Sequence, residues 1–361
     1  MNPLVDVVIP IHSVHRPLAR GLESCFDGNR GVRVTVVCHN IAEEEIRGLL
    51  SRTYPADALR FLELADGVPS PAGPLDLGVR SATADFIAVM GSDDFLEPGA
   101  LDSWRAAMED SGADFLAAPL RTENGQRIGV PRVRRPGSIR LDPAKDGFAY
   151  ATAGLGLWRR SALEATGARY GLGLRTGEDL EFGLKLWFSG KPLLHPEEPF
   201  YVIGGEAPDR VTEIRWSIAE CLKPLKTLDT AWFRGLRPSW RRSISLKLWR
   251  MNVFAYVLGR RADSRVSDED REALRMAFDV LTAIARLEDT PLSLAEAGFA
   301  RRLAHLDADQ SALDDAVAAF RSASLPRKLI TPRPWMLLAA GSPLRGALFS
   351  VMTRARQMGR K

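Results

Sequence analysis

The sequence predicts an α/β domain with a mostly parallel sheet, followed by a domain made of helices. Strand and helix patterns alternate through the first 64 residues, which is typical of βαβ units with parallel strands. From Trp216 onward, apolar residues recur only at helical spacing. We therefore expect a Rossmann-like sheet in a first domain of residues 1–214 and a helical domain over residues 215–324.

Local patterns predict the elements of the first domain. Apolar, β-branched runs such as residues 5–10 indicate buried strands. Apolar residues one turn apart, such as Leu18 and Leu22, indicate helices. The Pro- and Gly-rich residues 65–74 fit neither pattern and predict a loop that shapes a rim. In chain order we expect strand 5–10, helix 18–26, strand 32–37, helix 43–50, strand 59–64, helix 77–82 and strand 85–90.

An acidic turn follows the last of these strands. Asp93 and Asp94 come directly after it, and Pro98 stands where the next helix should begin. The two carboxylates should therefore lie at the carboxyl end of a parallel strand, the edge where ligands bind in open α/β sheets. Adjacent acids need a counter-charge, which a divalent ion on a substrate's phosphates can supply. The alternative is an acidic turn that caps the next helix.

Composition and short motifs narrow the function classes. Cys25, Cys38 and Cys221 are widely spaced without a metal-binding pattern, which favours a reducing cytosol. The chain has no G-x-G-x-x-G motif and no P-loop, so the dinucleotide and ATP fingerprints are absent. No apolar run approaches the roughly 20 residues that a membrane helix needs, and no secretion signal is visible. We therefore expect a cytoplasmic protein.

The charge is concentrated at the end of the chain. Residues 325–361 contain eight Lys and Arg residues and no acid, which leaves a net charge of −4 on residues 1–324. A nucleic-acid-binding protein carries its basic surface on the folded body, so we expect no nucleic-acid partner. We interpret residues 325–361 as a basic amphipathic tail, broken near Pro343, that docks on the anionic inner face of the cell membrane. The alternative is that the tail packs on the helical domain with solvated charges.

The helical domain carries no chemistry that its sequence identifies. Ile244, Leu248, Met251 and Ala255 fit one apolar stripe, and residues 274–285 carry another. Acceptor positioning, self-association and surface docking are the roles that this pattern leaves open.

Three motifs taken together resemble a known family. A strand ending at Pro10 and residues 90–101, which hold the paired aspartates, are similar to family 2 glycosyltransferases with the GT-A fold. The resemblance continues through residues 154–163 and ends in residues 177–187, which are similar to the Glu-Asp motif of that family. It extends over residues 4–212.

The resemblance implies an inverting glycosyltransferase that moves a sugar from a nucleotide sugar, UDP-linked, to a hydroxyl of a cell-surface polysaccharide or its lipid-linked precursor. Teichoic acid, capsule and cell-wall glycan are the acceptors implied. Asp94 would bind Mg²⁺ or Mn²⁺ with Asp93 beside it, and Asp93 would also hold the ribose or the donor sugar. Asp179 would be the general base for the acceptor hydroxyl, with Glu178 shaping its charge. A non-catalytic docking protein of the same fold is the alternative.

The second acidic pair also fits a purely structural role. Thr176 would be the N-cap of a capping box, and acids in the first turn are favoured by the helix dipole. A carboxylate in a first turn is well oriented by its helix, so capping and catalysis are compatible.

The resemblance places the donor pocket at the ends of the first three strands. Pro10, Ile11 and His12 would contact the donor, with the His12 ring stacked on the base. His39 stands where the family has an aspartate that contacts uracil, and Asp66 would contact the ribose or the base. A plain surface or strand-end residue is the alternative for each histidine.

Two further positions bear on substrate binding. Trp158 and Arg159 suit an acceptor wall, because aromatic rings stack on sugars, and core packing is the alternative for Trp158. Leu75 and Asp76 stand where the family often has an Arg-Asn pair, so that phosphate-binding arginine is missing.

Overall fold

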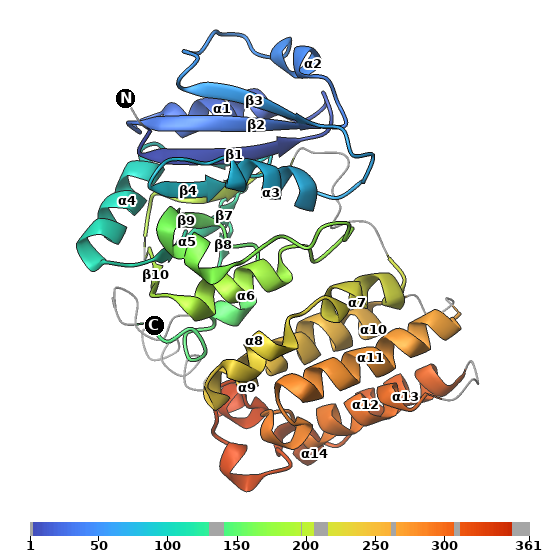
Figure 1. The fold of residues 1–361 in the computed structure, drawn as a ribbon. Helices are drawn as coiled ribbons and strands as arrows, with labels where there is room; N and C mark the ends of the chain where they lie inside the picture. Colours follow the sequence, from blue (N-terminus) through green and yellow to red (C-terminus); the bar gives the residue numbers. More distant parts are fainter. Residues whose placement is uncertain are drawn as a thin grey trace. The chain divides into compact units, whose positions relative to one another are not determined.

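The structure is a computed structural model that describes residues 3–129, 141–195, 197–205, 216–260, 265–306 and 311–348. The chain divides into two compact units, residues 1–214 and residues 215–361 (Figure 1). The first unit contains the strands, and the described part of the second consists of helices and their connections.

A seven-stranded sheet forms the centre of the first unit. Its strand order is β10-β6-β9-β4-β1-β2-β3. Every neighbouring pair is parallel except the two pairs that β9 makes, with β4 and with β6. The predicted mostly parallel α/β sheet is therefore confirmed. The strands are β1 (Val5–Ile11), β2 (Val32–His39), β3 (Leu59–Leu64), β4 (Phe86–Val89), β6 (Phe115–Ala117), β9 (Gly156–Arg159) and β10 (Pro192–Leu194).

The register of the central strands gathers their carboxyl ends at one edge. Val5 of β1 pairs with Val32 of β2 and with Phe86 of β4, so the three strands start at the same level. Ile11 pairs with Cys38 at the other end of β1. The residues that follow β1, β2 and β4 therefore emerge at the same edge, where open parallel sheets bind ligands.

One charged side chain lies inside the sheet at the opposite edge. The Asp6 side chain is fully buried in β1, and Arg33 of β2 forms a bidentate pair with it at 2.6 and 2.8 Å. The backbone N–H groups of Thr83 and Ala84 donate to Asp6 Oδ2 at 2.7 and 2.8 Å. Both oxygens of this buried carboxylate are hydrogen-bonded. Asp6 and Arg33 therefore hold residues 83 and 84, which lead into β4, against β1 and β2.

Helices cover both faces of the sheet. The helices of the first unit are α1 (Leu18–Phe26), α2 (Glu43–Arg47), α3 (Ala72–Arg80), α4 (Ala100–Ser111), α5 (Arg160–Thr166) and α6 (Leu180–Ser189). Helix α3 begins at Ala72, whereas we expected a loop through residue 74 and a helix over 77–82. Pro74 falls in the first turn of α3, where proline costs no hydrogen bond. Gly78 brings α3 against β1, since a Cβ there would lie 2.2 Å from Val8.

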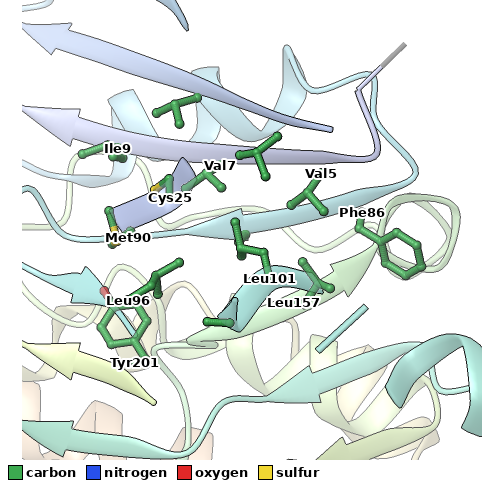
Figure 2. Packing of buried hydrophobic residues seen from close by; sticks show 14 of the residues in the cluster. Val5, Val7, Ile9, Cys25, Phe86, Met90, Leu96, Leu101, Leu157 and Tyr201 are labelled. Atoms are coloured by element: carbon green, nitrogen blue, oxygen red, sulfur yellow. The ribbon is translucent and has the colours of Figure 1, made fainter. Parts of the chain in front are cut away.

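One apolar cluster packs between the sheet, α1 and α4. Figure 2 shows Val5, Val7 and Ile9 of β1 pointing into this cluster, with Cys25 of α1 and Leu101 of α4 around them. These strand residues alternate with Val8, which faces α3, as the two-residue period of a strand requires. The cluster holds rigid the strands whose ends carry the polar residues described below.

A second, small sheet of four strands extends the first unit, and the sequence did not predict it. The strand order is β5-β11-β7-β8, with Tyr201 of β11 opposite Leu96 of β5. Strands of two or three residues show no periodicity, and β11 comes from a segment far along the chain from the other three strands. The strands are β5 (Phe95–Leu96), β7 (Leu120–Thr122), β8 (Arg127–Ile128) and β11 (Tyr201–Ile203).

The second unit is a helical array. Its helices are α7 (Ile218–Lys226), α8 (Thr230–Gly235), α9 (Pro238–Lys247), α10 (Ala255–Gly259), α11 (Asp268–Ile284), α12 (Leu294–Ala304), α13 (Ser311–Arg321) and α14 (Leu325–Leu329). Residues 248–254 between α9 and α10 form a π-helix. The wider turn shifts the helical face, so Met251 is exposed and Trp249 buried, which corrects the stripe expected through Met251. No helix of the described residues is both long and apolar enough to cross a membrane.

The beginning of the predicted tail packs on this helical unit. The N–H of Leu294 donates to the carbonyl of Ile330 at 2.8 Å, and Arg250 donates to the carbonyl of Gly341 at 2.8 Å. The described part of the tail is not one continuous helix, because a turn at Gly341 precedes Pro343, and residues 343–348 are helical. The basic residues expected further along, Arg354, Arg356, Arg360 and Lys361, lie outside the described residues.

Candidate functional site

The paired aspartates lie in the turn between the two sheets. The N–H of Asp94 donates to the carbonyl of Gly91 at 3.1 Å and so closes the turn between β4 and β5. Gly91 leaves room for the carboxylate, because a Cβ there would lie 2.6 Å from Asp94 Oδ2. Asp93 and Asp94 therefore follow the carboxyl end of β4, as the sequence predicted.

Asp94 is oriented by Tyr201 of β11 and by Gly204, which directly follows that strand. The Tyr201 hydroxyl donates to Asp94 Oδ2 at 2.5 Å, and the N–H of Gly204 donates to Asp94 Oδ1 at 2.9 Å. The Tyr201 hydroxyl also accepts the N–H of Gly91 at 3.1 Å. Burial, and then the charge of Asp94, hold the pKa of Tyr201 well above its usual value, so this hydroxyl keeps its proton. Each Asp94 oxygen thus has one fixed donor.

Asp93 is paired with an arginine that the sequence analysis did not identify. Arg16 Nη1 lies 3.2 Å from Asp93 Oδ1, and both side chains are about nine-tenths buried, at 9% and 11% exposure. Arg16 follows β1 in the loop before α1. This arginine therefore supplies one counter-charge to Asp93, and the metal expected at the turn stays a prediction.

A second arginine links the acidic turn to the small sheet. Arg20 of α1 pairs with Glu123, and its guanidinium lies 4.3 Å from the ring centre of Phe95. The N–H of Gly205 also donates to Glu123, at 3.2 Å. The hydrogen bond from Arg20, followed by that from Gly205, lowers the pKa of Glu123. Arg16, in the loop before α1, and Arg20 of α1 thus bring positive charge to the acidic turn.

His39 and Asp66 meet at the ends of β2 and β3. His39 Nε2 lies 2.9 Å from Asp66 Oδ1, and the His39 side chain is buried. The N–H of Val68 donates to the same oxygen at 2.9 Å. This bond, followed by the contact with His39, lowers the pKa of Asp66. The neighbouring strand β1 ends with two of the predicted donor residues, Pro10 and Ile11, and the exposed His12 directly follows it.

The second acidic pair lies at the start of α6. Asp179 is the N-cap of this helix, and its side chain makes no capping hydrogen bond. The expected capping box with Thr176 as N-cap is therefore wrong, because α6 begins three residues later than that box requires. Burial, and then the neighbouring charge of Asp179, raise the pKa of Glu178 to about 7. A carboxyl group with a pKa near 7 can take up and release a proton close to neutral pH, which suits acid–base chemistry.

Tyr170 lies beside this pair. Its ring stacks on Phe182 of α6 with centroids 4.2 Å apart, and its hydroxyl is buried without a hydrogen-bond partner among the described residues. Burial, then the charges of Asp179 and Glu178, hold the pKa of Tyr170 well above its usual value.

The loop that carries the second pair is fastened to α3 and to the loop before it. Arg169 makes a bidentate pair with Asp76 of α3, both contacts at 2.7 Å. The Ser70 hydroxyl donates to the carbonyl of Leu174 at 2.5 Å. The loop after β3, which contains Asp66 and Ser70, and the loop that leads to Glu178 therefore pack together.

The predicted acceptor residues require correction. Trp158 is 0% exposed, its indole N–H donates to the carbonyl of Gly154 at 2.8 Å, and its ring packs on Phe182. Trp158 is therefore a core residue and cannot form an acceptor wall. Arg159 pairs with Phe86 at the amino end of β4, and its guanidinium lies over the Phe86 ring. It thus lies at the edge of the sheet opposite Asp93 and Asp94.

The residues at the acidic turn fit a divalent ion held partly by a substrate. Both Asp94 oxygens accept a hydrogen bond from a fixed donor, and a carboxylate oxygen can accept more than one partner. Within the described ranges, no three His, Cys, Asp or Glu residues form a group that could hold a metal alone. Mg²⁺ is commonly held by one or two carboxylates together with substrate phosphates, so Asp94 suits this kind of site.

Solved structures of similar fold are known. The chain is similar to S. aureus TarS 1–349 in complex with UDP-GlcNAc, with 12% identity, a TM-score of 0.71, and coverage of 88% of this chain and 90% of that chain. The corresponding complex with UDP is 14% identical, with a TM-score of 0.68 and the same coverage. A longer S. aureus TarS structure is covered over 54% of its length, at 13% identity and a TM-score of 0.66.

The similarity to these solved structures concerns the fold and not the sequence. No protein-family model matches the sequence, and no curated protein matches it. At 12–14% identity the likeness shows the fold alone, a mostly parallel α/β domain followed by helices, as predicted.

Proposed function

We propose that the protein is an inverting glycosyltransferase of family 2 type that uses a UDP-sugar. The observation that carries this proposal is the oriented acidic turn after β4, in a fold similar to S. aureus TarS structures with UDP-GlcNAc and UDP. The buried Arg16–Asp93 pair, the bonds to Asp94 and the His39–Asp66 contact all surround the carboxyl ends of the strands.

The donor would lie across these strand ends. Pro10, Ile11 and His12, together with His39 and Asp66, would contact the nucleoside, and Asp93 would contact the ribose or the sugar. Asp94 would hold Mg²⁺ or Mn²⁺, which neutralises the charge of the leaving diphosphate. The fixed bonds from Tyr201 and Gly204 keep the Asp94 carboxylate in one orientation, which lowers the cost of binding.

The Glu178–Asp179 pair would supply the base. The acceptor oxygen bonds to the anomeric carbon while the bond from that carbon to the diphosphate breaks, and Asp179 takes the hydroxyl proton. The raised pKa of Glu178 limits the negative charge beside Asp179 near neutral pH. The acceptor would be a cell-surface polysaccharide or its lipid-linked precursor, of teichoic acid, capsule or cell-wall glycan type.

Two variants test these assignments. We expect UDP to bind in the presence of Mn²⁺, and Asp94→Asn should weaken that binding in calorimetry. Asp179→Asn should keep donor affinity and lose transfer, measured as UDP release with an acceptor glycan. Unchanged, metal-independent UDP binding in Asp94→Asn would contradict the metal assignment. UDP binding without transfer to any surface-glycan acceptor would favour the non-catalytic docking protein instead.

A further inference from the structure

The segment of residues 325–348 exposes an unusual amount of apolar surface. Five of the ten exposed large apolar side chains among the described residues belong to it. Leu325 and Trp335 are each 68% exposed, Leu338 is 62% exposed and Leu348 is 50% exposed. Single exposed apolar residues are ordinary, but a concentration of them in one segment marks a contact surface.

These side chains do not belong to a loose chain end. Thr331, Met336 and Ser342, which alternate with them, are buried at 2%, 8% and 1% exposure. The backbone on both sides is tied to the helical unit by hydrogen bonds at Ile330 and Gly341. The segment is therefore anchored by its inward residues and presents Trp335 and Leu338 outward.

Basic groups lie directly beside the exposed apolar groups. The Arg333 guanidinium lies 5.3 Å from the Trp335 ring centre, and Arg345 donates to the carbonyl of Leu338 at 3.2 Å. Arg333 also pairs with Asp289 at 3.3 Å, so Arg345 and the exposed Arg327 of α14 contribute more free charge. Residues 325–361 contain no acid.

We propose that residues 325–348 dock the protein on an anionic lipid bilayer, with Trp335 and Leu338 inserted among the headgroups. Tryptophan prefers this depth, because its ring is apolar and its N–H is polar. Arginines beside it can reach lipid phosphates while their stems stay on the apolar surface. The two alternatives for the tail are thereby joined: the segment packs on the helices through one side and binds lipid through the other.

The experiment uses the full chain and vesicles without donor or acceptor, so it does not depend on the proposed transfer reaction. Vesicles of phosphatidylcholine alone are compared with vesicles that also contain phosphatidylglycerol. Truncation before residue 325 would remove the buried Met336 and Ser342, so substitutions of exposed residues are preferred. The test variant is Trp335→Ala/Leu338→Ala, and the control is Leu172→Ala, since Leu172 is 61% exposed in the first unit.

We expect the wild type to pellet with the anionic vesicles at low salt and to be released at high salt. The double variant should partition roughly a hundredfold less, because each of the two large apolar side chains gains about tenfold on leaving water. Leu172→Ala should bind like the wild type. Three results would overturn the proposal: no binding by the wild type, equal binding by the double variant, or a dimer in sedimentation that Trp335→Ala/Leu338→Ala dissociates.

Discussion

Replacing Tyr201 by Phe isolates the bond that orients Asp94. Tyr201 is 1% exposed, and its hydroxyl donates to Asp94 at 2.5 Å and accepts from Gly91 at 3.1 Å. Figure 2 shows the ring beside Leu96 in the apolar cluster, so phenylalanine keeps this packing and only the hydroxyl is lost.

The expected cost follows from the two lost bonds. A hydrogen bond to a charged group contributes about 1.5–3 kcal/mol, and the part-buried N–H of Gly91 loses this acceptor as well. Asp94 keeps its bond from Gly204 and is only half-buried, so water can replace part of the loss. We therefore expect Tyr201→Phe to lower the unfolding free energy of the first unit by about 2 kcal/mol.

Tyr170→Phe is the matched control. Tyr170 is 4% exposed, and its hydroxyl has no hydrogen-bond partner among the described residues. Because an unpaired buried hydroxyl is unfavourable, this variant should be neutral or more stable. Urea unfolding measures the stability of both variants, provided that the m-value is unchanged. Hydrogen exchange of strands β4 and β11 shows that the change belongs to the first unit. Equal effects of the two substitutions, or a change under about 0.5 kcal/mol in Tyr201→Phe, would refute the reasoning.

Two further predictions concern buried carboxylates. Because burial and Asp179 raise the pKa of Glu178 from 4.5 to about 7, the native state holds a proton that the unfolded chain releases, and stability should fall as pH rises between these values. Glu178→Gln should remove this slope in urea titrations across that range, and an unchanged slope would contradict the shift. Asp6→Ala should cost about 3–5 kcal/mol, because it removes the carboxylate partner of Arg33 and leaves two N–H groups without their acceptor, whereas Glu43→Ala, at an exposed pair, should cost under about 1 kcal/mol. Comparable midpoints for these two variants in thermal unfolding would show that Asp6 is not a structural anchor.

The sequence by itself determined the features that depend on neighbouring residues. Apolar runs of period two and stripes of period 3.6 predicted the central strands and most helices, because both periods follow from backbone geometry. The acidic turn was found because Asp93 and Asp94 directly follow one such strand. The helical character of the second unit followed in the same way, except where the π-helix changed the period around Met251.

Only the tertiary structure decided which residues meet. Arg16 reaches Asp93 and Tyr201 reaches Asp94 from elements 77 and 107 positions away in the chain, and no local pattern encodes such a pairing. Trp158 shows the same limit, since an apolar strand residue can line a site or fill a core, and the packing of α6 against β9 placed it in the core. The charges at the acidic turn are thus compensated by contacts made only when the sheet has formed, because burial and long-range pairing are properties of the folded chain.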